Sequence, residues 1–222
     1  MNREFPMARL GRHLTDTLLI LVIVTVFTGL LLLLIGASPT EALSHLISGS
    51  FGSWSKLSRV LNVWIPLTLC SVGLVYAFRS GLWNIGVEGQ MVLGAIGTAG
   101  VLRMGLESGH PLLLLCLALI AGALLGASWA LFAGWLKIRG GVHEIFAGLG
   151  LNFVAMGLVL WLIFGPWKRP GIASMSGTEP FPRDLWFPTL EGWRVSPFAL
   201  TLVIILILAT VWILNRSRFG LN

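Results

Sequence analysis

Polar residues interrupt a strongly apolar chain at residues 79–90, RSGLWNIGVEGQ, and these side chains are the best placed to do chemistry. The segment places Arg79, Asn84, Glu88 and Gln90 among glycines, between two apolar runs. Ionisable groups inside a membrane are energetically expensive, so they usually face a cavity, a partner or an interface. If a helix begins near Gly86, Glu88 falls in its first turn, where the positive end of the helix dipole stabilises a carboxylate.

Two interpretations of this segment stay open. Gly81, Gly86 and Gly89 allow the chain to break and re-enter, which a membrane tolerates only where protein or water covers the backbone. Discontinuous helices of this kind line transport pathways. The alternative is a short cytoplasmic loop with a charged start to the next helix.

Hydrolytic chemistry fits the sequence poorly. An intramembrane serine protease needs a serine and a histidine on facing helices; Ser128 and His143 are available, but no oxyanion-donor group is visible. A metalloprotease would need HExxH, and HEIFA at His143 lacks the second histidine. No GxxxxGK[ST] motif occurs, so energy coupling through a P-loop would require a partner. Cys70 and Cys116 form neither a metal-binding spacing nor a disulfide framework. We expect no cofactor or metal on this chain.

The composition indicates a membrane protein. Mean hydropathy is +0.88, 56% of residues are hydrophobic and 11% are charged, against about 25% charged residues in soluble domains. The net charge of +6 comes from small basic groups between apolar runs. This pattern indicates membrane topology signals and contact with lipid, and it excludes a continuous nucleic-acid-binding surface.

Six apolar runs approach the length of about 20 residues that a spanning helix needs. We therefore predict an all-α, polytopic transmembrane helical bundle of about six spans, forming one transmembrane domain over 1–222. The third span is the least apolar, because Arg103 lies near its end. We interpret the first as an uncleaved helix, since its apolar core exceeds the roughly 7–15 residues of a signal peptide. The spans are 18–35, 60–78, 90–106, 111–136, 145–164 and 197–214.

The positive-inside rule predicts a cytoplasmic N-terminus, with 1–17 as a cytoplasmic segment of a cell inner or plasma membrane protein. Six spans return the C-terminus to the cytoplasm. A loop at 165–196, rich in proline and tryptophan, then lies outside; it either rests on the membrane surface or docks an external partner. The basic residues assigned to the cytoplasm are Arg3, Arg9, Arg12, Arg79, Lys137, Arg139, Arg216 and Arg218.

Small residues recur inside the predicted spans. Gly94, Gly97 and Gly100 repeat every three residues, and Gly122 and Gly126 form a GxxxG motif. Such spacing favours close helix packing and carries no chemistry of its own.

The stretch GLWNIGVEGQMVLGA resembles the Asn-Ile-Gly-x-Glu-Gly-Gln signature of ABC-importer permease subunits for nucleosides and simple sugars. That group is related to the ribose-type and branched-chain amino-acid permeases. GVHEIFAGLGLNFVA resembles the second landmark of the same family, with His143 in place of the usual asparagine and Phe153 in place of the usual tyrosine. FGPWKRPG and RSRFGL also fit, and the similarity runs from about Arg12 to the end.

This resemblance implies a permease that pairs with a second permease subunit, as a homo- or heterodimer, around a central pathway. It further implies ABC ATPase subunits on the cytoplasmic side and an extracytoplasmic substrate-binding protein. Residues in the two landmarks are expected to shape or gate the pathway. The alternative is a role in helix packing. These residues are Asn84, Gly86, Glu88, Gly89, Gln90, Glu144 and Asn152.

The family continues beyond RSRFGL with a coupling segment and further spans, so this chain is expected to be the N-terminal part of a longer permease. The function implied is transport by a subunit that is not itself an enzyme. The expected cargo is a nucleoside, with a simple sugar as the second choice. The alternatives are a structural or assembly membrane protein, such as an inactive truncated permease, and a membrane-embedded hydrolase. The sequence does not name the cargo, because a separate binding protein largely sets specificity in such systems.

Overall fold

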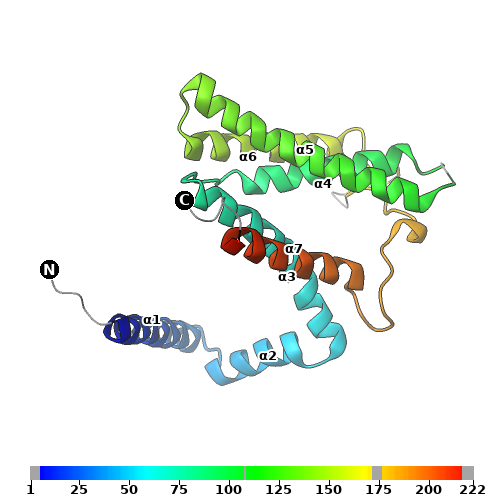
Figure 1. Cartoon of the computed structure of the whole chain (residues 1–222). Helices are drawn as coiled ribbons and strands as arrows, with labels where there is room; N and C mark the ends of the chain where they lie inside the picture. The colour runs from blue at the N-terminus through cyan, green and yellow to red at the C-terminus, as the bar shows by residue number, and fades with distance from the viewer. Residues whose placement is uncertain (1–5, 108, 172–176, 217–222) are drawn as a thin grey trace. The chain divides into compact units, whose positions relative to one another are not determined.

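The computed structural model describes residues 6–107, 109–171 and 177–216, and the described residues are helical with irregular connections. The chain divides into two compact units, 1–61 and 62–222, and the boundary falls within α3. The predicted all-α fold class is confirmed. The helices in Figure 1 are α1 (Pro6–Leu34), α2 (Pro39–Phe51), α3 (Trp54–Arg79), α4 (Val87–Met104), α5 (Pro111–Gly140), α6 (Glu144–Phe164), the short 3₁₀ helix η1 (Arg183–Leu185) and α7 (Pro197–Arg216).

Each of the six predicted spans coincides with a helix, and among the described residues five of these are long and apolar enough to cross a membrane. The helix outside this group is α4, which has Glu88 in its first turn and Arg103 in its last. The difference between six spans and five therefore lies in the helix that follows the polar segment.

In the first unit, α2 lies between the predicted spans 18–35 and 60–78, where the apolar runs predicted no helix. The helix begins at a capping sequence: the Ser38 side chain accepts a hydrogen bond from the Glu41 backbone N–H at 3.4 Å, and Pro39 occupies the first helical position. Both features favour helix initiation. No residue of α2 is buried, which is typical of a helix lying at a membrane interface.

In the second unit, α4 and α5 form an antiparallel hairpin (Figure 1). Gly126 of α5 lies against the Gln90 carbonyl at one end, and Gly105 faces Leu114 at the other. Midway, a methyl group added to Gly97 would lie 2.8 Å from the Ala121 carbonyl oxygen. The glycines therefore provide the close packing that their spacing predicted.

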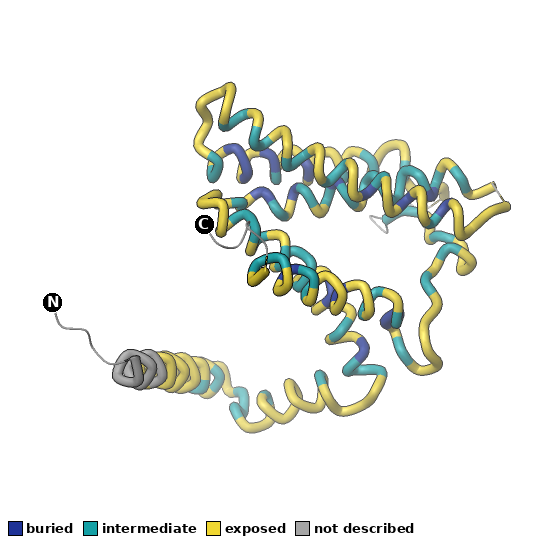
Figure 2. The backbone as a smooth tube through the Cα atoms, viewed as in Figure 1, coloured by how far each residue is buried: buried dark blue, intermediate teal, exposed yellow. Residues whose placement is uncertain are grey.

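The core of the second unit lies mainly where α4, α5 and α6 meet, as the dark residues in Figure 2 show. One cluster joins Leu102 of α4 to Leu114 and Ala118 of α5. From α6, a face with one residue per helical turn enters the core. That buried face comprises Ala147, Leu151 and Ala155.

Helices α3 and α7 lie side by side in Figure 1 and are joined by a hydrogen bond from the Tyr76 hydroxyl to the Thr210 hydroxyl, at 3.1 Å. The last described residue is Arg216, at the end of α7. The RSRFGL sequence covers residues 216–221, so Arg218 and most of this motif lie outside the described residues, as does Arg3.

Candidate functional site

The segment that opened the sequence analysis is a sharp turn between α3 and α4. After Arg79, the Leu82 N–H bonds to the Ala77 carbonyl and the Gly81 N–H bonds to the Phe78 carbonyl, both at 3.0 Å. This pairing is a Schellman motif, and it requires the left-handed conformation that Gly81 adopts at φ +71°. The chain therefore reverses at Gly81 and restarts as α4 at Val87.

Asn152 of α6 holds the start of α4 in place. Its side-chain oxygen accepts the backbone N–H of Gly89 at 2.8 Å, and its side-chain nitrogen donates to the carbonyl of Ile85 at 3.1 Å. The first N–H groups of a helix lack partners within the helix, and the N-cap residue of α4, Gly86, has no side chain to supply one. Asn152 therefore caps α4 from a neighbouring helix.

Two backbones meet beside this cap. Gly86 and Gly148 are both buried, and a Cβ atom on Gly148 would lie 2.7 Å from the Gly86 backbone nitrogen. Only glycine permits so close an approach. The contact brings the turn before α4 directly onto α6.

Asn84 and Gln90 are joined across the same turn by a reciprocal amide pair. Asn84 Nδ2 donates to Gln90 Oε1 at 3.3 Å, and Gln90 Nε2 donates to Asn84 Oδ1 at 3.0 Å. Both side chains are half-buried. The pair therefore satisfies one donor and the acceptor of each amide where water is partly excluded.

Lys137 and Glu144 connect the last turns of α5 to the first turn of α6. Lys137 Nζ lies 3.1 Å from Glu144 Oε2, and each charge also suits the dipole of its own helix end. The Nδ1 atom of His143 accepts the Ile145 N–H at 3.4 Å, which requires a ring whose Nδ1 carries no proton. His143 is thus the N-cap of α6.

Two cavities adjoin these groups. The small cavity, of about 190 Å³, is lined from the turn and α4 by Trp83, Asn84 and Gln90, and from α5 and α6 by Lys137 and Glu144, among others. The large cavity, of about 500 Å³, is open and lies between α3, α4 and α5. Its lining is apolar apart from Cys70, Asn84 and Gln90.

The seven predicted site residues are thus only partly brought together. Asn84, Gly86, Gly89, Gln90 and Asn152 form one hydrogen-bonded and close-packed group, which we call the α4 junction. Glu144 lies beside it, on the wall of the small cavity. Glu88 is in the first turn of α4, as predicted, but its side chain is exposed and belongs to neither cavity lining nor the junction.

Three residues of the site were missed. Gly148 was not predicted as a site residue, and Lys137 was interpreted only as a topology signal. Glu144, seven residues after Lys137, was the available clue to the ion pair between these two side chains. The indole N–H of Trp129 is buried next to Gly89 and has no hydrogen-bond partner among the described residues. Nothing in the sequence indicated that position. Ser128, weighed above as a nucleophile, bonds to the Leu125 carbonyl of its own helix at 2.8 Å.

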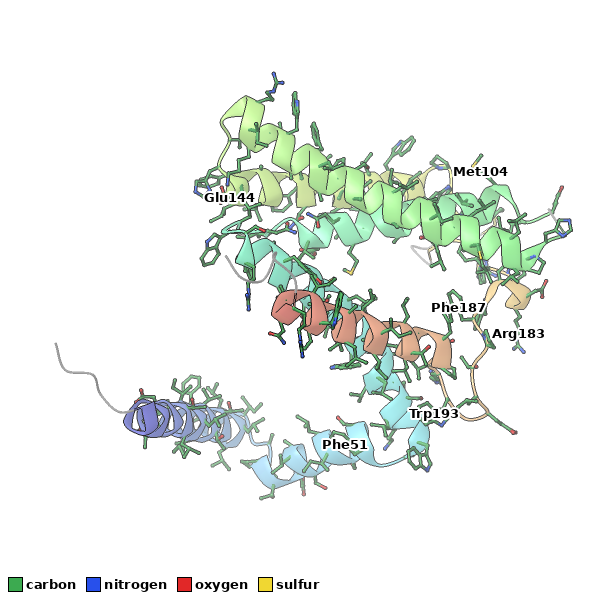
Figure 3. All side chains as sticks on the ribbon, viewed as in Figure 1. Phe51, Met104, Glu144, Arg183, Phe187 and Trp193 are labelled. Carbon is green, nitrogen blue, oxygen red and sulfur yellow. The ribbon has the colours of Figure 1, made fainter. Side chains whose placement is uncertain are left out.

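At the other end of α4, Arg103 holds the loop that follows α6. Its guanidinium lies 5.2 Å from the ring centroids of both Trp167 and Phe181, and Nη2 donates to the Glu179 carbonyl at 3.3 Å. Figure 3 shows Glu144 at one end of the α4–α6 layer and Met104 and Arg183 toward the other. The α4 junction and the Arg103 contact therefore lie at opposite ends of one helix.

The long apolar helices and the polar turn between α3 and α4 define a polytopic helical membrane protein. A family model described as "Branched-chain amino acid transport system / permease component" matches residues 56–222, and the chain belongs to this family. Permease subunits of ABC transporters are transport components, not enzymes themselves. Its membership of the permease family and its long apolar helices make this chain a multi-pass membrane protein.

Curated relatives agree with this assignment. The glucose ABC transporter permease protein TsgB13 of Haloferax volcanii is 30% identical, over 86% of this chain and 52% of its own length. The guanosine ABC transporter permease protein NupP of Bacillus subtilis is 32% identical, over 68% of this chain and 43% of its own length. The nucleoside ABC transporter permease protein NupB of Lactococcus lactis is 26% identical, over 86% of this chain and 54% of its own length. The chain thus spans about half the length of these relatives. No solved structure matches it.

Proposed function

We propose that this chain forms part of the translocation pathway of an ATP-driven importer for a nucleoside or a simple sugar. The relatives are named for guanosine, nucleosides and glucose. The observation that carries the proposal is the pair of bonds from Asn152 to Ile85 and Gly89, because they join the two sequence landmarks where α4 begins. Asn84 and Gln90, beside these bonds, line both cavities of the site, and in the topology proposed below this region lies at the cytoplasmic end of the bundle.

The proposed topology has a cytoplasmic N-terminus and six crossings, α4 included. An 18-residue helix is about 27 Å long, close to the ~30 Å of a bilayer core, and α4 packs along α5 over this length. The hydropathy of α4 is lower than that of the other spans, which suits a helix that packs against α5 and α6 and so exposes less of its surface to lipid. A reporter fused after Gly109 should then be active outside, and one fused after Gly141 should be active inside. Without a crossing by α4 the two sides exchange, so a cytoplasmic reporter at Gly109 and an external one at Gly141 would contradict the six-span topology.

The partners we propose are ABC ATPase subunits, a second permease subunit and an extracytoplasmic binding protein. ATP binding and hydrolysis on the ATPase would favour one of two global states of the pathway, giving alternating access. In this arrangement Lys137 and Glu144 face the cytoplasmic side. The 165–196 loop, held by Arg103, faces the binding protein.

The test is uptake of labelled guanosine and labelled glucose by cells that carry the whole transporter. We expect uptake of one of them that needs both ATP and the external binding protein and disappears when the gene for this chain is deleted. Uptake that persists after the deletion would contradict a pathway role. It would favour the alternative, a structural or assembly membrane protein.

A further inference from the structure

The amide side chains of Asn84 and Gln90 line both cavities of the site. Apart from these two amides, the described linings of the small and the large cavity have only Ala130 in common. The reciprocal amide pair therefore stands where the two cavities meet.

The pair keeps unused hydrogen-bonding capacity. A primary amide has two N–H donors and an oxygen with two lone pairs, so each amide retains one N–H and one lone pair after the reciprocal bonds form. The described lining of the large cavity contains no charged side chain. A mostly apolar cavity of this size, with a few polar groups, is typical of sites for small uncharged molecules.

We propose that this amide pair is a cargo-binding gate that opens when the lactam edge of a nucleobase replaces one of the two amides. A lactam, as in guanine or uracil, holds an N–H and a C=O side by side, which is the arrangement that each amide presents to the other. The exchange breaks the two hydrogen bonds between the amides and forms two with the lactam, and the displaced amide then bonds to water in the open large cavity. Amide side chains make the same kind of two-point contact with base edges in nucleic-acid recognition. The inference rests on the proposed function, and it names the nucleobase as the part of a nucleoside cargo that the amides contact.

Cys70 is a built-in reporter for this exchange, because it lines the large cavity together with both amides. The other cysteine, Cys116, is exposed on α5 and is removed by Cys116→Ser. The assembled permease–ATPase complex, in nanodiscs and without the binding protein, is then treated with a small methanethiosulfonate. Guanosine should slow the modification of Cys70. Glucose should not, and neither should 1-methylguanosine, whose lactam N–H is replaced by a methyl group.

The variants Asn84→Leu and Gln90→Met remove one amide each at similar size. Each should weaken protection by guanosine about tenfold, as expected for the loss of a two-point contact. Asn62→Leu makes the same chemical change at an exposed position of α3 outside both linings and should leave protection intact. Recovery of each variant in complex with the ATPase at the parent yield shows that it has kept its fold.

Equal protection by guanosine and 1-methylguanosine would overturn the gate, and this comparison needs no variant. Protection that survives in Asn84→Leu and Gln90→Met would also overturn it. ATP-driven guanosine uptake without any protection of Cys70 would overturn the gate and leave the proposed function standing. Absence of ATP-driven uptake of either guanosine or glucose would overturn the proposed function itself.

Discussion

The side-chain oxygen of Asn152 lies 2.8 Å from the backbone nitrogen of Gly89. A residue of α6 thereby caps α4 through a backbone N–H that lies 63 positions earlier in the chain. The bond makes the break between α3 and α4 a fixed element of the bundle, because the turn cannot move away from α6 without exposing unpaired backbone groups. The position of the signature motif thus depends on α6.

Asn152→Leu should destabilise the bundle. The change leaves the Gly89 N–H and the Ile85 carbonyl without their partner, and an unsatisfied buried polar group costs about 1–3 kcal/mol. The measurement is thermal unfolding of the purified complex in detergent. Asn62→Leu, at an exposed site, is the matched control and should unfold like the parent protein; equal unfolding temperatures for both variants would remove Asn152 from this role.

Gly148→Ala should disturb the contact between the turn and α6. Its added methyl would lie 2.7 Å from the Gly86 nitrogen, and relief of such overpacking costs about 1–3 kcal/mol. Gly157→Ala, on the same helix, meets nothing within 4 Å and serves as the control. We expect a lower yield of folded, membrane-extracted protein for the first variant only. A normal yield of Gly148→Ala would show that the two backbones can separate at little cost.

Arg103→Met should release the loop after α6. Cation–π contacts contribute about 0.5–2 kcal/mol each, and Arg103 makes two of them together with a hydrogen bond to the loop. Limited proteolysis of intact complexes should therefore cut between 165 and 196 faster in this variant. The control is Arg183→Met, an exposed arginine of the same loop. If both variants are cut at the parent rate, Arg103 does not hold the loop.

Glu88→Ala should lower uptake while membrane insertion stays normal. The carboxylate lies in the first turn of α4, where interaction with the helix dipole contributes about 0.3–1 kcal/mol, and it is the one acidic group on this turn. Glu107→Ala, just beyond the other end of α4, is the matched control. Unchanged uptake by Glu88→Ala at normal expression would remove Glu88 from the mechanism.

The sequence predicted the helices better than it predicted their contacts. Apolar runs located all six predicted helices, because length and hydropathy are local properties. The same method missed α2, whose capping residues Ser38 and Glu41 are a local signal that hydropathy does not register. The helix start expected near Gly86 placed Glu88 correctly in the first turn of α4.

The site was predictable only in part, because its contacts join residues far apart in the chain. The two landmarks named Asn152 and Gly89 separately, but nothing in their spacing indicates the bond between them. The ion pair of Lys137 and the stacking of Arg103 depend on how helices pack against one another. Glu88 shows the converse: its charge and setting drew attention in the sequence, yet the structure leaves it outside the α4 junction.

The central claim is that this chain is part of an ATP-driven importer, and its most direct test is native mass spectrometry of the complex extracted gently from its own membrane. The account predicts that the chain is found bound to an ABC ATPase subunit, together with a second permease subunit. A chain that is recovered without any ATPase, under conditions that keep other membrane complexes intact, would contradict it.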